Sequence, residues 1–174
     1  MVRVFIALGA NLGEPRAALA EAQARLRPLG VAPLRRARLY RSAPVGPPGQ
    51  PPYYNTALEV ETALLPDDLL AVLKQIEATM GRTPGERWGP RVIDLDIALY
   101  GGLVLDTPEL TIPHRELANR AFVLAPLCDL AADLEVPGRG ATLAALLEAL
   151  PRTPGDLEVV EHAVQDVRAA PIPR

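Results

Sequence analysis

Apolar residues along the first hundred positions follow two spacings, one typical of strands and one typical of helices. Continuous or alternating apolar runs predict strands over residues 2–9, 31–43, 53–61 and 92–100. Apolar residues three or four positions apart predict helices over residues 14–29 and 66–80. Each predicted helix has a proline at its start and a glycine just past its end, and both residues are favourable there.

Shorter elements are predicted in the second half of the chain. Two glycines, at 101–102, predict a tight hairpin that leads into a strand over 103–105. Short helical segments are expected over 115–133 and 141–150, and a last strand over 157–164. The order of the first six elements, β-α-β-β-α-β, predicts an α+β fold with a ferredoxin-like core. We therefore expect a mostly antiparallel sheet flanked by helices, with C-terminal additions.

The length and charge of the chain indicate how many domains it forms and which partners it does not bind. Its 174 residues fit one domain, so we expect a single domain over residues 1–174, with a variable extension over about 151–174. The 18 basic and 21 acidic side chains give a net charge of −3, which provides no basic field for a nucleic acid. No apolar run is long enough for a membrane span. We expect a cytoplasmic monomer that binds neither nucleic acid nor membrane.

Rare residue types exclude several chemistries. Ser42, the only serine, does not lie in a G-x-S-x-G motif, and Lys74, the only lysine, is not part of a Walker A loop. One cysteine cannot form an internal disulfide, and two distant histidines cannot form an H-E-x-x-H zinc site. Most covalent and P-loop chemistries are therefore excluded.

Two aspartates in the predicted strand over 92–100 form the clearest candidate site. Side chains two positions apart in a strand share a face, so Asp94 and Asp96 project together. The opposite face takes apolar residues, namely Ile93, Leu95, Ile97 and Leu99. Two close carboxylates repel each other unless a cation lies between them, and Mg²⁺ prefers carboxylate and phosphate oxygens. The pair alone does not establish a metal site, because a solvent-facing strand with acidic residues has the same pattern.

A basic loop leads directly into the two aspartates. Residues 81–91 contain Arg82, Arg87 and Arg91 together with Trp88, the only tryptophan. Guanidinium groups bind phosphate oxygens bidentately, and glycines and prolines let such a loop close over a ligand. The alternative is a solvated basic loop with its tryptophan packed on the core. The neighbouring aspartates favour a polyphosphate site.

Polar and aromatic residues in other segments extend this candidate site. The segment 110–122 contributes cationic or hydrogen-bonding groups at His114, Arg115 and Arg120. Tyr53, Trp88 and Phe122 lie in polar or loop-adjoining segments, where aromatic rings can stack on a flat heterocycle. Asn55 offers both a donor and an acceptor to the edge of such a ring. The alternative is that the aromatic side chains fill gaps between loops and core.

Seven motifs between residue 2 and about residue 137 carry a family resemblance. They cover residues 7–13, 40–44, 53–55, 86–91, 94–97, 111–114 and 119–122. Together they resemble the motifs of the 6-hydroxymethyl-7,8-dihydropterin pyrophosphokinases, which are enzymes of folate biosynthesis. The combination of E-R-W-G-P-R, D-L-D-I, P-H and N-R-x-F is highly specific, because several separated motifs would have to coincide.

The resemblance implies a reaction and the residues that carry it out. ATP is expected to donate its β,γ-pyrophosphoryl group to the hydroxymethyl oxygen of 6-hydroxymethyl-7,8-dihydropterin, which releases AMP. Two Mg²⁺ ions are expected on Asp94 and Asp96, and Arg82 and Arg91 are expected to assist the transfer. The remaining ATP contacts that the resemblance implies are Glu77, Trp88, Ile97, Thr111, His114, Arg115 and Arg120. The pterin contacts that it implies are Ser42, Pro44, Val45, Tyr53, Asn55 and Phe122.

Two loops are expected to close over these substrates. The loops are residues 44–52, which include five prolines, and residues 82–91.

Two other functions are also compatible with the sequence. A nucleotidyltransferase is one alternative, because a D-x-D strand with two metals also serves that chemistry. A non-catalytic nucleotide- or pterin-binding regulator is the other. The presence of both aspartates and the loop arginines argues against the regulator.

Overall fold

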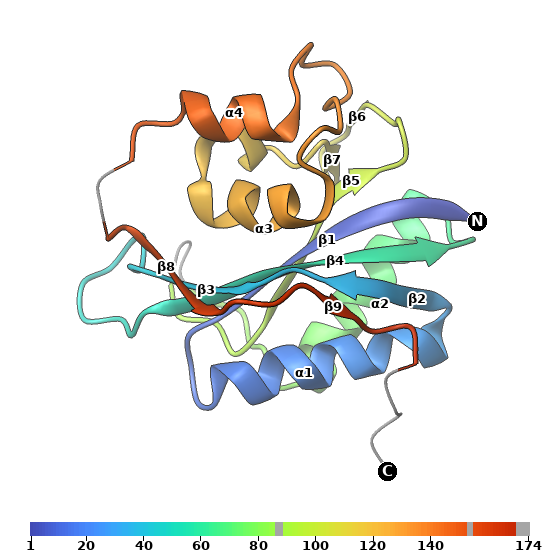
Figure 1. The fold of residues 1–174 in the computed structure, drawn as a ribbon. Coiled ribbons are helices and arrows are strands. Elements are labelled where there is room, and N and C mark those ends of the chain that lie inside the picture. The colour runs from blue at the N-terminus through green and yellow to red at the C-terminus, as the bar shows by residue number, and fades with distance from the viewer. Residues whose placement is uncertain (86–88, 153–154, 170–174) are drawn as a thin grey trace.

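An antiparallel sheet with helices on both faces forms the body of the protein (Figure 1). The computed structural model describes residues 1–85, 89–152 and 155–169. Within these ranges the sheet contains β1 (Val2–Ala10), β2 (Val31–Arg36), β3 (Leu39–Ser42), β4 (Tyr53–Thr62), β5 (Asp94–Tyr100), β8 (Leu157–Glu161) and β9 (Gln165–Asp166). Its main path runs β5-β1-β4-β2-β9, and β3 pairs with both β4 and β8. A separate pair consists of β6 (Leu105–Asp106) and β7 (Thr111–Ile112).

The helices cover the two faces of the sheet. They are α1 (Pro15–Leu26), α2 (Pro66–Thr79), α3 (Ala121–Ala131) and α4 (Leu143–Ala149), with the 3₁₀ turns η1 (Arg27–Leu29) and η2 (Leu117–Asn119). The first two helices lie on one face and the last two on the other (Figure 1). Ile6 and Leu58 are buried on the α1–α2 side. Their neighbours Phe5 and Ala57 are buried on the α3–α4 side, as the alternation of strand side chains requires.

The strand order confirms the predicted fold class. β4 lies between β1 and β2, and β1 lies between β4 and β5, so two split β-α-β units are interleaved. This is the ferredoxin-like arrangement, to which α3, α4 and the C-terminal strands are added. The residues that begin and end this helical segment also agree with prediction. α1 begins at Pro15, and Gly30 follows η1 with a φ of 85°.

One predicted strand is divided in the structure. Residues 31–43 form β2 and β3 instead of a single strand. At the break, the backbone amide of Arg38 donates to Oδ2 of Asp129 on α3 (3.2 Å), so a side chain takes the place of a strand partner. The short helical segments expected over 115–133 are η2 and α3, which the extended backbone of Arg120 separates.

The predicted hairpin between β5 and residues 103–105 is wrong. Leu105 pairs with Ile112 in the separate β6–β7 sheet. The backbone amide of His114, which follows β7, donates to the carbonyl oxygen of Ala98 on β5 (2.9 Å). The returning chain therefore occupies the edge of β5 that the hairpin strand would have used.

A bulge in β5 changes the face on which Leu99 lies. The pairing with β1 passes from Ile97 directly to Leu99 and leaves Ala98 as an extra residue. Alternation shifts by one position, and Leu99 is buried on the α3–α4 side instead of alongside Ile97. The prediction for Leu99 is wrong for this reason. Asp94 and Asp96 precede the bulge and keep their shared face.

The C-terminal region contributes two strands to the sheet. The strand predicted over 157–164 ends at Glu161 and forms β8, which pairs with β3. β9 was not predicted, and it pairs with the outer edge of β2.

Candidate active site

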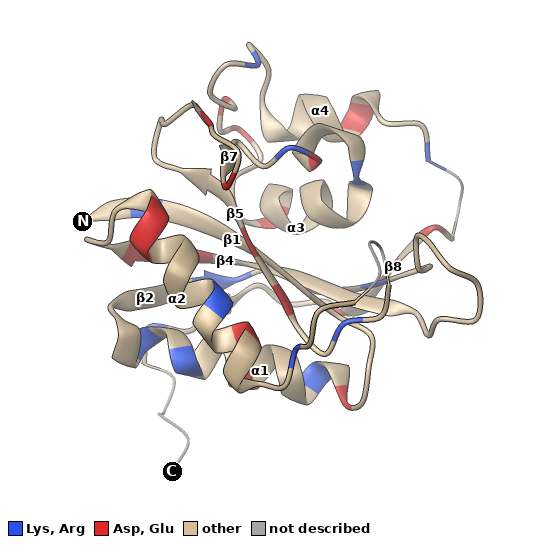
Figure 2. Cartoon of the chain, turned by 180° about the vertical axis from the view of Figure 1, so that it is seen from behind, with Lys and Arg blue, Asp and Glu red and all other residues tan. Residues whose placement is uncertain are grey.

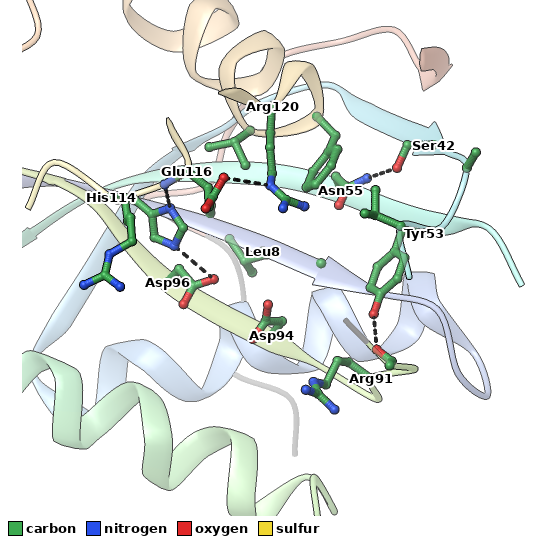
Figure 3. A pocket seen from close by; sticks show the side chains of 18 of the residues that line it. Leu8, Ser42, Tyr53, Asn55, Arg91, Asp94, Asp96, His114, Glu116 and Arg120 are labelled. Carbon is green, nitrogen blue, oxygen red and sulfur yellow. Dashed lines mark hydrogen bonds and ion pairs between the residues drawn. The ribbon is translucent and has the colours of Figure 1, made fainter. Parts of the chain in front are cut away.

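A cavity of about 380 Å³ opens where the ends of β1, β3, β4 and β5 meet the start of α3 (Figure 3). Its lining residues are Ala7, Leu8, Gly9, Ser42, Ala43, Val45, Tyr53, Asn55, Arg82, Gly89, Arg91, Asp94, Asp96, His114, Arg115, Glu116, Arg120, Phe122 and Val123. The sheet topology thus brings segments from both halves of the sequence to one place.

The aspartates of β5 form the acidic part of the cavity. Asp94 and Asp96 project into it together, as predicted (Figure 3). Figure 2 shows red acidic positions along β5 beside blue basic positions of neighbouring segments. Burial, and after it repulsion by Asp94, raises the pKa of Asp96 to about 7. Repulsion within this carboxylate pair favours a bound cation.

Arg82 lies between this acidic pair and a buried glutamate. Its Nη1 atom is 2.7 Å from Oδ1 of Asp94 and 2.6 Å from Oε2 of Glu77. Glu77 is buried on α2 and also accepts a hydrogen bond from the backbone amide of Leu95 (2.8 Å). Burial lowers the pKa of Arg82, but the charges of Asp94 and Glu77 outweigh burial and raise it. Arg82 is therefore a cation held in place at the edge of the acidic pair.

His114 faces Asp96 from the opposite wall. Its Nε2 atom is 3.8 Å from Oδ2 of Asp96, and its Nδ1 atom accepts a hydrogen bond from the backbone amide of Glu116 (3.1 Å). Burial lowers the pKa of His114, which favours the neutral ring near pH 7. Arg120 extends this wall, with its guanidinium 5.5 Å from the centre of the Phe122 ring.

The other end of the cavity is largely uncharged. Nδ2 of Asn55 donates to Oγ of Ser42 (2.8 Å), and both residues are buried, with 4% and 7% of their surface exposed. The hydroxyl of Tyr53 donates to the carbonyl oxygen of Gly89 (2.8 Å). A Cβ at Gly9 would lie 3.1 Å from Oδ1 of Asn55, so glycine leaves room for this amide. This end offers an aromatic ring and a fixed amide to a flat ligand.

Asn11 connects the two loops beside the cavity, and sequence reasoning did not single it out. It is 2% exposed, and its Oδ1 atom accepts a hydrogen bond from the backbone amide of Arg91 (2.9 Å). Its Nδ2 atom donates to Oε1 of Gln50 (3.2 Å) and to the carbonyl oxygen of Pro51 (3.1 Å). The available signal was its position in the motif over 7–13.

Most of the predicted site residues line the cavity. These are Ser42, Val45, Tyr53, Asn55, Arg82, Arg91, Asp94, Asp96, His114, Arg115, Arg120 and Phe122. Pro44 and Thr111 lie outside this lining. The side chain of Ile97 is buried in the core, and Glu77 is buried behind the cavity. Trp88 lies outside the described residues, and all of these individual roles stay predictions.

Sequence reasoning missed the remaining lining residues. They are Ala7, Leu8, Gly9, Ala43, Gly89, Glu116 and Val123. Most are small or apolar and carry no chemical signal of their own. Their positions inside or beside the matched motifs were the only indication in the sequence.

The fold and the site together define a class of protein. A ferredoxin-like domain joins a carboxylate pair and several arginines to a flat, amide-containing end, which suits an enzyme that transfers phosphate groups to a small heterocyclic acceptor. Residues 5–132 match the sequence model of the 7,8-dihydro-6-hydroxymethylpterin-pyrophosphokinase (HPPK) family. The chain belongs to this family.

Individual relatives agree with this assignment. The chain is 47% identical over 155 residues to the 2-amino-4-hydroxy-6-hydroxymethyldihydropteridine pyrophosphokinase of Pseudomonas aeruginosa, covering 86% of this chain and 92% of that protein. It is 46% identical over 127 residues to the folate synthesis bifunctional protein of Pisum sativum, covering 73% of this chain and 25% of that protein. A solved structure of Plasmodium falciparum HPPK-DHPS has a TM-score of 0.64 at 15% identity, covers 85% of this chain and 43% of that one, and supports the fold alone.

Family membership identifies the reaction. The chain is a transferase of folate biosynthesis that uses ATP as co-substrate and hydroxymethyldihydropterin as pyrophosphoryl acceptor. The predicted family, fold class and reaction are confirmed. Among the described residues, no helix is long and apolar enough to cross a membrane.

Proposed function

We propose that ATP and the pterin occupy opposite ends of the one cavity during the reaction. The triphosphate lies over Asp94 and Asp96, and the pterin lies between Tyr53 and Phe122. The observation that carries this proposal is that a single cavity of about 380 Å³ contains both the acidic–basic end and the amide–aromatic end. A volume in this range suits small-molecule ligands.

Two Mg²⁺ ions are proposed to bind at Asp94 and Asp96. The raised pKa of Asp96, about 7, supports a need for cations at this pair. In the described parts of the chain no group of three or more acidic, histidine or cysteine side chains could hold a metal, so phosphate oxygens and water would supply the other ligands. When bound, the ions would neutralise phosphate charge and orient the phosphates.

The arginines of the basic loop are proposed to assist the transfer itself. The hydroxymethyl oxygen forms a bond to the β-phosphorus while the bond from that phosphorus to the α,β-bridging oxygen breaks. AMP leaves, and the hydroxyl proton is released. Arg82 and Arg91 neutralise charge on the transferring group. Because Glu77 already holds Arg82 at 2.6 Å, little further ordering of that side chain is needed.

The remaining residues are proposed to position the two substrates. His114, Arg115 and Arg120 form the wall beside the triphosphate, where the Nε2–H group of the neutral histidine can donate to an oxygen. On the pterin side, the amide of Asn55 is oriented by its 2.8 Å hydrogen bond to Ser42, which leaves Oδ1 as an acceptor for the heterocycle.

Product analysis tests the proposed chemistry. Purified protein with hydroxymethyldihydropterin and Mg·ATP should release AMP and form a pyrophosphorylated pterin. Free pyrophosphate with a nucleotidylated acceptor would instead indicate a nucleotidyltransferase, and binding without turnover would indicate a regulator. Asp96→Ala should abolish AMP release with the fold intact, whereas the matched variant Asp133→Ala, at an exposed carboxylate in the turn after α3, should retain it.

We further propose that residues 1–174 act as one domain and as a cytoplasmic monomer. The support for a single domain is that β8 and β9, from the C-terminal region, join the central sheet. Light scattering should give the mass of one chain at concentrations at which the enzyme is active. Cell fractionation tests the cytoplasmic location.

A further inference from the structure

The C-terminal strand β8 lies against the part of the sheet that leads into the pterin end of the cavity. β3 has only four residues, and it pairs with β4 on one side and with β8 on the other (Figure 1). In the register, Ser42 lies opposite both Tyr53 of β4 and Leu157 of β8. β8 follows the residues that match the family description, which end at 132.

The position of Ser42 determines how the amide of Asn55 is presented. The Ser42 hydroxyl receives the Asn55 Nδ2–H group at 2.8 Å, and both side chains are buried. Residues 42, 43 and 45 also line the cavity. Without β8, β3 would be a short edge strand with unpaired backbone groups, followed at once by the proline loop. Ser42 would then be held from one side only.

Side chains at both ends of β8 add to its attachment. Glu158 pairs with Arg41 of β3 at 2.5 Å. Glu161 pairs with Arg36 of β2 at 3.1 Å and with Arg16 of α1 at 3.4 Å. These ion pairs are partly exposed and contribute little individually, so the pairing of β8 with β3 is the main attachment. The result is a strand tied to three other elements beside the pterin end.

We propose that β8 is a positioning element for pterin binding, because it fixes β3 and through Ser42 the recognition amide of Asn55. This inference rests on the proposed assignment of the pterin to that end of the cavity. The ATP end is built from β5, α2 and residues 114–120, and β8 pairs with none of them. Loss of β8 pairing therefore weakens pterin binding and leaves ATP binding unchanged.

The test compares two proline variants. Val159→Pro places proline in β8 opposite Tyr40, whereas the control Val164→Pro places it in the segment between β8 and β9. Calorimetry measures the Kd of hydroxymethyldihydropterin with Mg²⁺ and a non-hydrolysable ATP analogue present, and separately the Kd of that analogue. We expect the pterin Kd of Val159→Pro to rise at least about fivefold, with the analogue Kd within about twofold of wild type and Val164→Pro unchanged.

Two outcomes would overturn the inference. One is a folded Val159→Pro protein with wild-type affinity for the pterin, and the other is a folded protein whose affinities for the pterin and for the ATP analogue fall equally. If circular dichroism shows that Val159→Pro does not fold, the milder Val159→Gly decides, because glycine weakens the interior of a strand. A pterin Kd that rises while the analogue Kd stays at the wild-type value supports the inference, and an unchanged pterin Kd contradicts it. Failure of wild-type protein to bind the pterin would instead contradict the proposed function.

Discussion

Replacing Asp96 with asparagine should stabilise the substrate-free protein while abolishing its activity. Burial, and after it Asp94, raises the pKa of Asp96 from 3.8 to about 7. If the group were fully dry, this shift would correspond to roughly 4 kcal/mol of destabilisation at pH 8. The side chain is 36% exposed, so solvent screening reduces the expected gain on neutralisation to about 1–2 kcal/mol.

The stability gained by Asp96→Asn should be larger at high pH than at low pH. An acid with a higher pKa in the folded than in the unfolded chain destabilises the fold most fully above its folded pKa. The penalty decreases as the pH falls from about 7 towards about 4, because the folded protein then holds the proton. Asp96→Asn should therefore exceed the wild type in stability at pH 8 and lose most of this advantage near pH 4.

Urea denaturation in the presence of EDTA measures the free energy of unfolding at both pH values, and AMP release measures activity. The control Asp133→Asn changes an exposed carboxylate in the turn after α3 and should alter neither quantity. Added Mg²⁺ and ATP should stabilise the wild type more than Asp96→Asn. If Asp96→Asn is no more stable than the wild type at pH 8, the reasoning that Asp96 costs the fold stability is refuted.

Three further predictions follow from the site. Arg82→Ala should lower kcat by about a hundredfold or more while the Kd of ATP changes far less, since a contact that strengthens in the transition state is lost; steady-state kinetics with calorimetry checks this, and unchanged kcat would remove Arg82 from the mechanism. Asn55→Ala should weaken pterin binding by about 1–2 kcal/mol without changing the ATP Kd, and equal loss for both substrates in calorimetry would argue against a pterin-specific amide. Gly9→Val should also weaken pterin binding, because its Cβ would lie 3.1 Å from Oδ1 of Asn55, and wild-type pterin affinity would show that the amide moves without cost.

The chemistry of the site was predictable where it depends on local spacing. Asp94 and Asp96 share a face because they are two positions apart in one strand, and that geometry does not depend on the rest of the fold. The arginine loop precedes them in sequence, so its proximity was also predictable. The helix boundaries followed from Pro15 and Gly30 in the same local way.

Features that depend on distant partners were not predictable. The bulge at Ala98 arises from pairing with β1, and it moved Leu99 to the other face of the sheet. The edge of β5 is occupied by the backbone of His114, so the expected hairpin did not form. The contacts of Asn11 join segments 39 to 80 positions away, which no local pattern in the sequence encodes.

We also expect Asn11 to couple the binding of ATP thermodynamically to the binding of the pterin. One buried amide holds the backbone of Arg91, in the loop assigned to ATP, and that of Pro51, in the loop assigned to the pterin. Ordering of one loop by its substrate thus reduces the entropy that remains to be lost when the other loop orders. Linkage requires this cooperativity to be reciprocal, so ATP should raise the affinity for the pterin by the same factor by which the pterin raises the affinity for ATP.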